Sequence, residues 1–599
     1  MDATTSNWWS RDKRNFVHSD SYNSDTGSSL AVNGDIALSV QITDWLGFSS
    51  NNRLAIGTGW YRSLTDPRVR EGISMSGSLY NSNDLSTYAI TSNMFKLKKT
   101  WGLHSFNGLI GFETEKNDYK LIAATGQGLP VGLTVLDAAS VPYTVNGTET
   151  ESAFTSGFSQ FNYNYKGRYF ATVSYRIDGS SKFGINNRWG SFPSASASWL
   201  MTEEDFMKSV KQIDLLKVRA SYGVTGNANI GDFQHLAKYA FNTQYSSLPA
   251  GYPQNLPNPD LGWEKAYTLN IGVDASFFDR VKMTVDVYDI KNRDLLLNVP
   301  LSPSSGFEYQ TRNSGTVQNR GIELQLTTTN IKKASFVWET TLSVSLNRNK
   351  VLELADGVDE IITGVEAKQI IQVGEDIYTW YMPKWLGVDP ANGDPLWEKI
   401  IYDENGTEVD RVATNNYNEA QFQEVGTATP KFTGGLISNM KYKGFSLNFA
   451  LNYVYGNDVY NRSRQFFDND GAYIAYNSIK LLDGWTRWEK EGDIATHPKA
   501  VANGNKLSNN VSSRYIEDGS YLRLRNISLS YDVPQAFARK FRLESIRVFI
   551  TGDNLLTLTN YSGMDPEVSI VGDTWVRPGT GDFKYPISRQ LLFGVDVTF

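Results

Sequence analysis

The sequence predicts an all-β protein, an antiparallel transmembrane β-barrel. Apolar and polar side chains alternate along many segments, as they do in strands with one apolar face. The connections between these segments alternate between short turns and long loops, which is typical of outer-membrane barrels. Aromatic residues make up 13% of the chain, glycine occurs 50 times and hydrophobic content is 40%. This composition suits many amphipathic strands rather than a thick apolar core.

The alternation is clear in GDIALSVQIT, YFATVSYRID, LKVRASYG, FSLNFALNYVY and the final LLFGVDVTF. In each of these segments one face of the strand is apolar and the other is polar or small. The pattern predicts seventeen strands, at residues 35–43, 45–61, 86–98, 103–124, 153–165, 168–178, 188–201, 213–224, 264–277, 281–294, 317–329, 335–348, 431–441, 445–456, 515–532, 545–557 and 589–598.

The connections distinguish a membrane barrel from a soluble β-sandwich. A sandwich buries the apolar faces between two sheets and has no reason to confine its long loops to one end. A barrel turns those faces to membrane lipid and has short periplasmic turns and long extracellular loops. Short turns are predicted at Asp44, 166–167, 278–280 and 442–444. Long loops are predicted at 125–152, 225–263, 349–430, 457–514 and 558–588, and 349–430 has room for a further hairpin.

Charge and composition exclude several function classes. The net charge of −7 weighs against nucleic-acid binding, which needs a basic face. The absence of cysteine excludes disulfides and thiolate metal sites. The four histidines are far apart in sequence and have no metal-ligand spacing, so we expect no metal and no cofactor. No GxSxG, HExxH or P-loop motif occurs, and we expect no enzymatic activity.

The odd strand number predicts that the barrel is incomplete. With the last strand on the short-turn side, residues 1–34 are expected to be the remnant of an extracellular loop, and 35–599 the C-terminal part of a barrel. An open sheet in lipid would leave edge N–H and C=O groups unpaired, at several kcal/mol each. The beginning, MDATTSNWWSRDKRNF, has no apolar signal-peptide region. We therefore expect this chain to be part of a longer protein.

Five stretches of the chain have the character of family motifs. They are SYRIDGSSKFGINNRWGSFPSASASW (174–199), NPDLGWEKAYTLNIGVD (258–274), NSGTVQNRGIELQL (313–326), YLRLRNISLSYDVP (521–534) and GDNLLTLTNYSGMDPEV (552–568). These stretches resemble the barrel motifs of the SusC/RagA family of TonB-dependent outer-membrane transporters, and they occur in the family's order.

The resemblance implies a 22-stranded barrel, of which about 17 strands are present, with a plug, a TonB box and a signal peptide absent from this chain. It also implies location in the bacterial outer membrane and a SusD-like surface lipoprotein as a lid. Import of oligosaccharides (or peptides) would draw energy from the TonB complex. The alternative function is a passive porin or an adhesive barrel without TonB coupling, which would need a closed barrel with an even number of strands.

One long loop has the composition of a ligand site. The segment 371–397 offers aromatic faces that can stack on sugars, although packing within the loop explains the same residues. The candidates are Tyr378, Trp380, Tyr381, Trp385 and Trp397. Asp389, Asn392 and Asp394 in DPANGDP offer oxygen atoms for Ca²⁺, but their spacing is not that of an EF-hand loop, and a turn is expected.

Other residues are assigned to the barrel wall. Arg176, Asp178 and Arg188 are predicted to be lumenal charges that pair with each other or with a plug, and Trp263 is predicted to be an interfacial anchor. In the last strand, alternating apolar residues and a terminal aromatic resemble the signal that barrels present to the barrel assembly machinery. These residues are Phe593, Val595, Val597 and Phe599.

Overall fold

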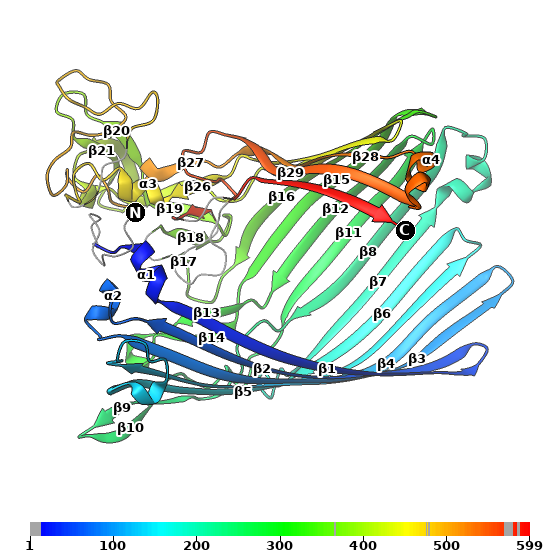
Figure 1. Ribbon diagram of the computed structural model, residues 1–599, viewed down its shortest axis with the longest axis horizontal. Coiled ribbons are helices and arrows are strands. Elements are labelled where there is room, and N and C mark those ends of the chain that lie inside the picture. Colours follow the sequence, from blue (N-terminus) through cyan, green and yellow to red (C-terminus); the bar gives the residue numbers. More distant parts are fainter. Residues whose placement is uncertain (1–12, 365–366, 475, 477–479, 568–578, 584–586) are drawn as a thin grey trace. The chain divides into compact units, whose positions relative to one another are not determined.

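A computed structural model describes the chain except residues 1–12, 365–366, 475, 477–479, 568–578 and 584–586. Its main element is one sheet of 17 strands (Figure 1). Each strand overlaps one of the predicted segments, so the predicted strand number and order are confirmed. The strands are β1 (Ser24–Thr43), β2 (Leu46–Thr65), β3 (Ser78–Trp101), β4 (His104–Gln127), β5 (Val141–Tyr165), β6 (Tyr169–Ser180), β7 (Trp189–Leu200), β8 (Ile213–Asn227), β11 (Glu264–Phe277), β12 (Val281–Arg293), β15 (Thr316–Lys333), β16 (Phe336–Glu353), β24 (Phe432–Tyr442), β25 (Phe445–Tyr455), β28 (Tyr521–Asp532), β29 (Ser545–Thr559) and β31 (Gln590–Thr598).

The chain divides into two compact units. The first unit comprises Met1–Ala197, Gly223–Ala266 and Asp294–Ser314. The second unit comprises Ser198–Tyr222, Tyr267–Arg293 and Gly315–Phe599.

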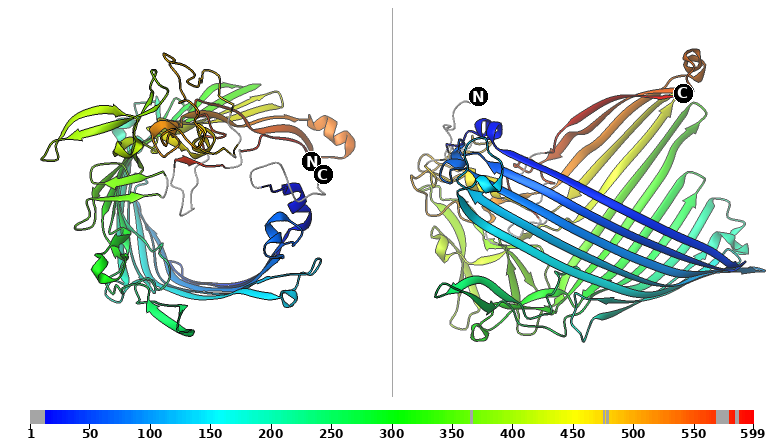
Figure 2. Two further views of the ribbon diagram at one scale, coloured as in Figure 1. Left: turned by 90° about the vertical axis from the view of Figure 1, so that its left-hand side faces the viewer. Right: turned by 60° about the horizontal axis from the view of Figure 1, so that its bottom comes forward.

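In the first unit, β1 to β6 pair in sequence order, each antiparallel to the next. Two short helices, α1 (Phe16–Tyr22) and α2 (Arg70–Ile73), lie at the same end of this unit (Figure 2). The Arg68 guanidinium lies 3.9 Å from the ring centroid of Tyr22. Asn15 caps α1 by accepting from the Val17 and His18 N–H groups.

The first strand is longer than predicted. β1 begins at Ser24 rather than at residue 35, so residues 24–34 are not part of a loop. The sequence SDTGSSLAVNG has few apolar residues, and its alternation is too weak to be recognised. Its pairing with β2, from Ser24 opposite Leu64 onward, extends the strand through backbone hydrogen bonds that any residue except proline can make.

The short turns lie where they were predicted. Lys166 and Gly167 have φ of 57° and 67°, and Lys443 and Gly444 have φ of 45° and 91°. Two consecutive residues with positive φ are typical of a type I′ turn, whose twist matches that of the strands it joins. These turns therefore fix the register of their hairpins.

In the second unit, eight strands form consecutive antiparallel pairs, in the order β12, β15, β16, β24, β25, β28, β29 and β31. The last strand pairs with β29, from Ser545 opposite Thr598 to Asp553 opposite Gln590. Phe593 and Phe599 expose 71% and 92% of their surface.

The long loops contain secondary structure of their own, and 349–430 holds seven strands rather than one extra hairpin. These strands have four to eight residues each and lack a clear alternation of apolar and polar side chains. The loop strands are β9 (Tyr239–Tyr245), β10 (Leu248–Pro253), β13 (Leu296–Pro300), β14 (Tyr309–Asn313), β17 (Glu360–Thr363), β18 (Gln369–Gln372), β19 (Thr379–Pro383), β20 (Trp385–Val388), β21 (Pro395–Tyr402), β22 (Glu408–Thr414), β23 (Phe422–Thr427), β26 (Asp458–Asn461), β27 (Ile516–Asp518) and β30 (Thr580–Gly581).

The remaining helices are short. None of the helices in the described ranges is long and apolar enough to cross a membrane. They are α3 (Arg462–Phe467) and α4 (Gln535–Ala538), with 3-10 turns at Leu136–Ala138, Met201–Glu203, Asp205–Met207, Pro303–Ser305, Tyr417–Glu419, Ser513–Tyr515 and Arg539–Phe541.

Candidate functional site

Two of the sequence motifs meet in the first unit. The turn after β6 lies against the NPDLGW segment, where the Gly184 N–H donates to the Leu261 carbonyl at 2.8 Å. The Asn186 N–H donates to the Pro259 carbonyl at 3.1 Å, and its side-chain amide donates to Asp260 at 2.7 Å. Segments that are distant in sequence are thus joined through backbone groups.

A third motif completes this contact. Asn313 accepts from the Gly262 N–H at 2.7 Å and donates to the Gly262 carbonyl at 2.8 Å. Because an amide side chain offers both a donor and an acceptor, Asn313 pairs with the backbone as a neighbouring strand would. We call residues 180–188, 258–263 and 311–314 the motif junction.

Gly184 permits the close approach within the motif junction. A Cβ atom added at Gly184 would lie 2.1 Å from the Pro259 carbonyl oxygen, and one added at Gly262 would lie 2.7 Å from the Asn187 Cβ. Both distances are far below a van der Waals contact, so each position requires glycine.

Trp263 is not an interfacial anchor. Its side chain is buried, and its ring centroid lies 5.0 Å from that of Phe183 and 5.2 Å from that of Phe192. Its Nε1–H donates to the Arg188 carbonyl at 3.0 Å. The prediction was wrong because tertiary contacts, not the position at a strand start, decide whether this ring reaches lipid. Trp263 forms the apolar part of the motif junction.

Two of the three predicted lumenal charges form a pair. Arg176 Nε donates to Asp178 at 2.7 Å, and Arg176 Nη2 donates to Ser156 at 2.8 Å. Glu113 lies 3.4 Å from the same guanidinium. Arg188 instead contributes its carbonyl to the motif junction. A substrate or plug contact for these residues stays a prediction.

The remaining two motifs meet in the second unit. Arg523 on β28 is buried, and its guanidinium pairs with Asp565 at 2.6 Å and also with Glu567. Its Nε donates to Thr557 on β29 at 3.0 Å. Two carboxylates from one motif therefore neutralise the buried arginine of the other. The sequence contains all of these residues in its motifs but does not indicate that they touch.

The predicted loop aromatics do not form one open platform. Trp380 and Trp397 are fully buried, which leaves neither ring face open for a sugar. Trp380 packs with Met382, Tyr460 and Tyr515, which we call the loop core, and its Nε1–H donates to the Asp458 carbonyl at 3.1 Å. Burial assigns these two tryptophans to packing within the loops.

The other three loop aromatics are partly exposed. The ring of Trp385 lies 5.7 Å from that of Trp397 in an edge-on arrangement, and Arg514 lies 5.0 Å from the Trp385 ring. Tyr381 packs against Phe422 at 5.7 Å. Ligand contact through Tyr378, Tyr381 and Trp385 stays a prediction.

A cluster of buried charges lies beside the loop core. Asp470 pairs with Arg514 at 2.5 Å and with Arg487 at 2.8 Å. Asp468 pairs with Arg464 at 2.5 Å and lies 3.1 Å from His497 Nε2. The only sequence signal of this cluster is the pattern DND at 468–470. From the sequence alone this pattern predicts a solvated turn, because Arg487 and Arg514, which pair with Asp470, are distant in sequence. We call these six residues the polar centre.

The surroundings of Asp468 favour its charged form. Burial by itself would raise the pKa of Asp468, but the hydrogen bond with His497 and the charge of Arg464 outweigh burial and hold that pKa below its usual value. Burial disfavours the charged form of Arg514, whereas Tyr515 and Asp470 raise its pKa. Paired and hydrogen-bonded charges can stay buried at neutral pH.

DPANGDP forms the predicted turn. The Gly393 N–H donates to the Asp389 carbonyl at 2.8 Å, and the Asp389 side chain accepts from the Asn392 amide at 2.8 Å. The Asp394 carboxylate pairs with Lys506 at 2.7 Å and with Lys499 at 3.1 Å. Two lysines therefore pair with the Asp394 carboxylate, which a bound Ca²⁺ would need as a ligand. No group of three or more potential metal-binding side chains occurs among the described residues.

Comparison with known proteins places these features in a family. Residues 2–555 match the family model described as TonB dependent receptor-like, beta-barrel. TonB-dependent receptor P39 of Formosa agariphila is 32% identical over 85% of this chain and 52% of the receptor. TonB-dependent receptor SusC of Bacteroides thetaiotaomicron is 30% identical over 75% of this chain and 44% of that receptor.

The fold agrees with a solved transporter. The structure of the RagAB peptide transporter matches with a TM-score of 0.85 and 25% identity, over 97% of this chain and 63% of that chain. The chain spans about half the length of the curated relatives it matches. This chain therefore belongs to the family of TonB-dependent receptor-like β-barrels.

Proposed function

We propose that this chain forms barrel wall and outer loops of a SusC-like importer in the bacterial outer membrane, not an enzyme. The observation that carries the proposal is the chemical difference between the two faces of the main sheet. Exposed aliphatic side chains line one face, as at Ile322 and Leu346. The opposite face holds charged groups such as Arg219 and Asp286, which pair at 2.6 Å. Lipid suits the first face and a polar lumen suits the second.

The relatives support the proposed partners and substrates. A SusD-like lipoprotein would cover the long loops, and the TonB complex would supply energy. The substrate would be an oligosaccharide or a peptide: the loop aromatics suit sugars, while the structural relative is described as a peptide transporter. The apolar side chains of β31, ending at Phe599, would engage the barrel assembly machinery during insertion.

A comparison of uptake in matched strains tests the proposal. The native host, a strain lacking this gene and a strain lacking TonB would each receive a panel of fluorescent oligosaccharides and oligopeptides. Loss of uptake of the same compound in both mutant strains is the expected result. Uptake that needs this gene but not TonB would favour the passive porin. If loss of the gene changed the uptake of no compound in the panel, the importer proposal would be overturned.

A further inference from the structure

We propose that a groove on the aliphatic face of β11, β12, β15 and β16 binds lipid A, the phosphorylated glycolipid of the outer leaflet. The acyl chains would lie in the groove, and the phosphates would bind to basic side chains at its long-loop end. This inference rests on the proposed insertion in the outer membrane and adds a specific lipid site to it.

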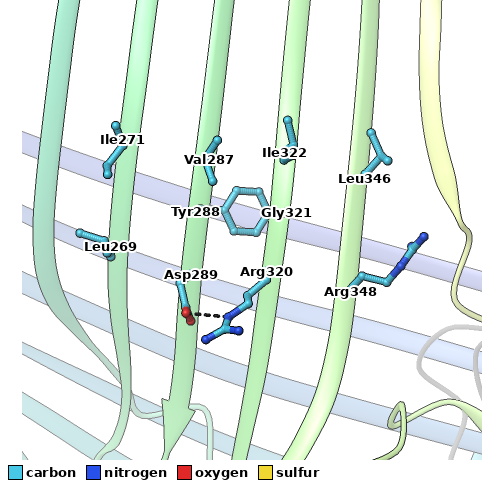
Figure 3. Close-up of a pocket in the computed structure, with 10 residues that line it drawn as sticks. All are labelled: Leu269, Ile271, Val287, Tyr288, Asp289, Arg320, Gly321, Ile322, Leu346 and Arg348. Atoms are coloured by element: carbon cyan, nitrogen blue, oxygen red, sulfur yellow. Dashed lines mark hydrogen bonds and ion pairs between the residues drawn. The ribbon is translucent and has the colours of Figure 1, made fainter.

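The groove has an aliphatic floor (Figure 3). Its volume is about 460 Å³. Its floor residues expose between 38% and 50% of their surface, and they are Leu269, Ile271, Val287, Ile322 and Leu346. The pairing of β12, β15 and β16 places Val287, Ile322 and Leu346 directly opposite one another in one cross-strand row. Two further aliphatic rows follow toward the short-turn end, Val285–Leu324–Val344 and Met283–Leu326–Leu342.

Toward the long loops, the same face changes abruptly from aliphatic to basic. The next row consists of Asp289, Arg320 and Arg348, and the row after it of Lys291, Gln318 and Lys350. These two rows carry four cations and one carboxylate, in a chain whose net charge is −7. Strands are about 4.8 Å apart and alternate residues about 7 Å apart, so the basic patch is about 10 Å by 7 Å. That area suits a headgroup with more than one phosphate.

The single carboxylate does not neutralise the patch. Arg320 Nε lies 2.7 Å from Asp289, whose oxygen atoms also accept from Gln318 at 2.8 and 3.0 Å. Arg348, directly opposite Arg320, donates from Nη1 to the carbonyls of Asn347 and Lys431, at 3.0 Å each. Like charges directly opposite one another on a sheet are destabilising, and a bound anion would remove this cost. Guanidinium groups bind phosphate through paired N–H donors.

The position of the basic rows along the strands indicates which leaflet the bound lipid would come from. β11 and β12 are joined by the short turn at 278–280, at the end opposite to Asp289. Since short turns are periplasmic and long loops extracellular, the basic rows lie at the outer leaflet. Exposed basic groups beside aliphatic rows are the features that hold a phosphorylated amphiphile at an interface.

Native mass spectrometry of the full gene product that carries this chain tests the inference. Delipidated protein in detergent would be titrated with lipid A, with dephosphorylated lipid A, with phosphatidylglycerol and with inorganic phosphate. We expect saturable binding of lipid A, and at least a tenfold weaker apparent affinity in the double variant R348Q/K350Q. The matched control K332Q/K333Q removes the same charge from the short-turn end of β15, the strand that pairs with β16, and should bind as the unmodified protein does.

Other outcomes are equally decisive. Equal binding of lipid A by R348Q/K350Q and by the unmodified protein, or equal binding of dephosphorylated lipid A, would overturn the site. Phosphatidylglycerol binding as tightly as lipid A would overturn the choice of lipid, and binding of inorganic phosphate alone would overturn the role of the groove. The assembled fraction in the outer membrane, measured by heat-modifiable gel mobility, is a separate readout. If the unmodified protein did not assemble in the outer membrane, the result would count against the proposed function and not against the lipid site.

Discussion

At the scale of single residues, buried charges hold the long loops together. Asp470 and Arg514 are both buried in the polar centre, where Asp470 pairs with Arg514 and also with Arg487. An isolated buried charge is far more costly than a buried pair, because the desolvation penalty remains when the partner is removed. These residues therefore matter more to loop structure than the exposed ion pairs do.

Replacing Arg514 by methionine should open the loops. Removing one partner of a buried ion pair costs up to about 3–5 kcal/mol. Asp470 keeps its pair with Arg487, so the loss should lie below that limit, and Arg514→Met should expose residues 457–515 to proteinase K. Peptide mapping of digested, detergent-solubilised protein would measure this. Lys208→Met is the control, because Lys208 pairs with Asp205 on the surface and should change little. Equal digestion of the two variants would contradict the prediction.

Asp394 should make one loop sensitive to acid. Burial raises the pKa of Asp394, but hydrogen bonds from Lys506 and Lys499 outweigh burial and lower it. In the unfolded chain an aspartate has a pKa of about 3.9, so on acidification the unfolded state takes up the proton first. The stabilisation by this residue is thus complete above about pH 5 and is lost as pH falls through the lower pKa of the folded state.

Hydrogen exchange around residues 389–394, corrected for the intrinsic rate, would measure this loss between pH 6 and pH 3. Protection should decrease below about pH 4 in the unmodified protein. Asp394→Asn should be less protected at pH 6 and should show a smaller pH dependence. An identical pH profile in both proteins would exclude Asp394 as the responsible group.

At the scale of elements, the family motifs act as joints between distant segments. The motif junction connects the end of β6 with the segments before β11 and at β14, through backbone groups and one asparagine. Arg523 connects β28 with the segment after β29 in the same way. These contacts give the motifs a structural role, because they fix the positions at which the long loops leave the sheet.

Gly184→Ala should disrupt the motif junction. The added methyl group would lie 2.1 Å from the Pro259 carbonyl oxygen, and overpacking of this kind costs about 1–3 kcal/mol. The melting temperature of the purified protein should fall. At Gly147, on β5, the nearest atom to an added Cβ lies 3.8 Å away, so Gly147→Ala should melt close to the unmodified protein. A Gly184→Ala variant as stable as Gly147→Ala would disprove this account.

At the scale of the whole molecule, the two faces of the sheet predict which substitutions a membrane tolerates. Leu324 and Gln325 are neighbours near the middle of β15 and lie on opposite faces. Leu324→Lys should lower stability by about 2–4 kcal/mol, the cost of a lysine facing lipid at the bilayer centre. Gln325→Lys, which faces the polar side, should cost much less. Unfolding in urea, in liposomes, would compare the two variants, and equal losses would refute the assignment of faces.

Much of the fold could be predicted from the sequence, because strand alternation is a local property. Each residue's own polarity decides which face it takes, and small or polar residues at turns end the strand. Boundaries were less certain where the alternation is weak, so β1 begins eleven residues before the predicted start. The short strands in the loops were missed for the same reason.

The contacts of the candidate site could not be predicted from the sequence, because they form only in the tertiary structure. Sequence alone determined the strands, the short turns, the aliphatic face and the motifs of the family. Only the tertiary structure buried Trp380 and Trp397, moved Trp263 into the motif junction and brought Asp468 and Asp470 to their arginines. It also aligned Arg320, Arg348, Lys291 and Lys350 into one basic patch. Alternation is encoded residue by residue, whereas burial and charge pairing depend on which distant segments the fold places in contact.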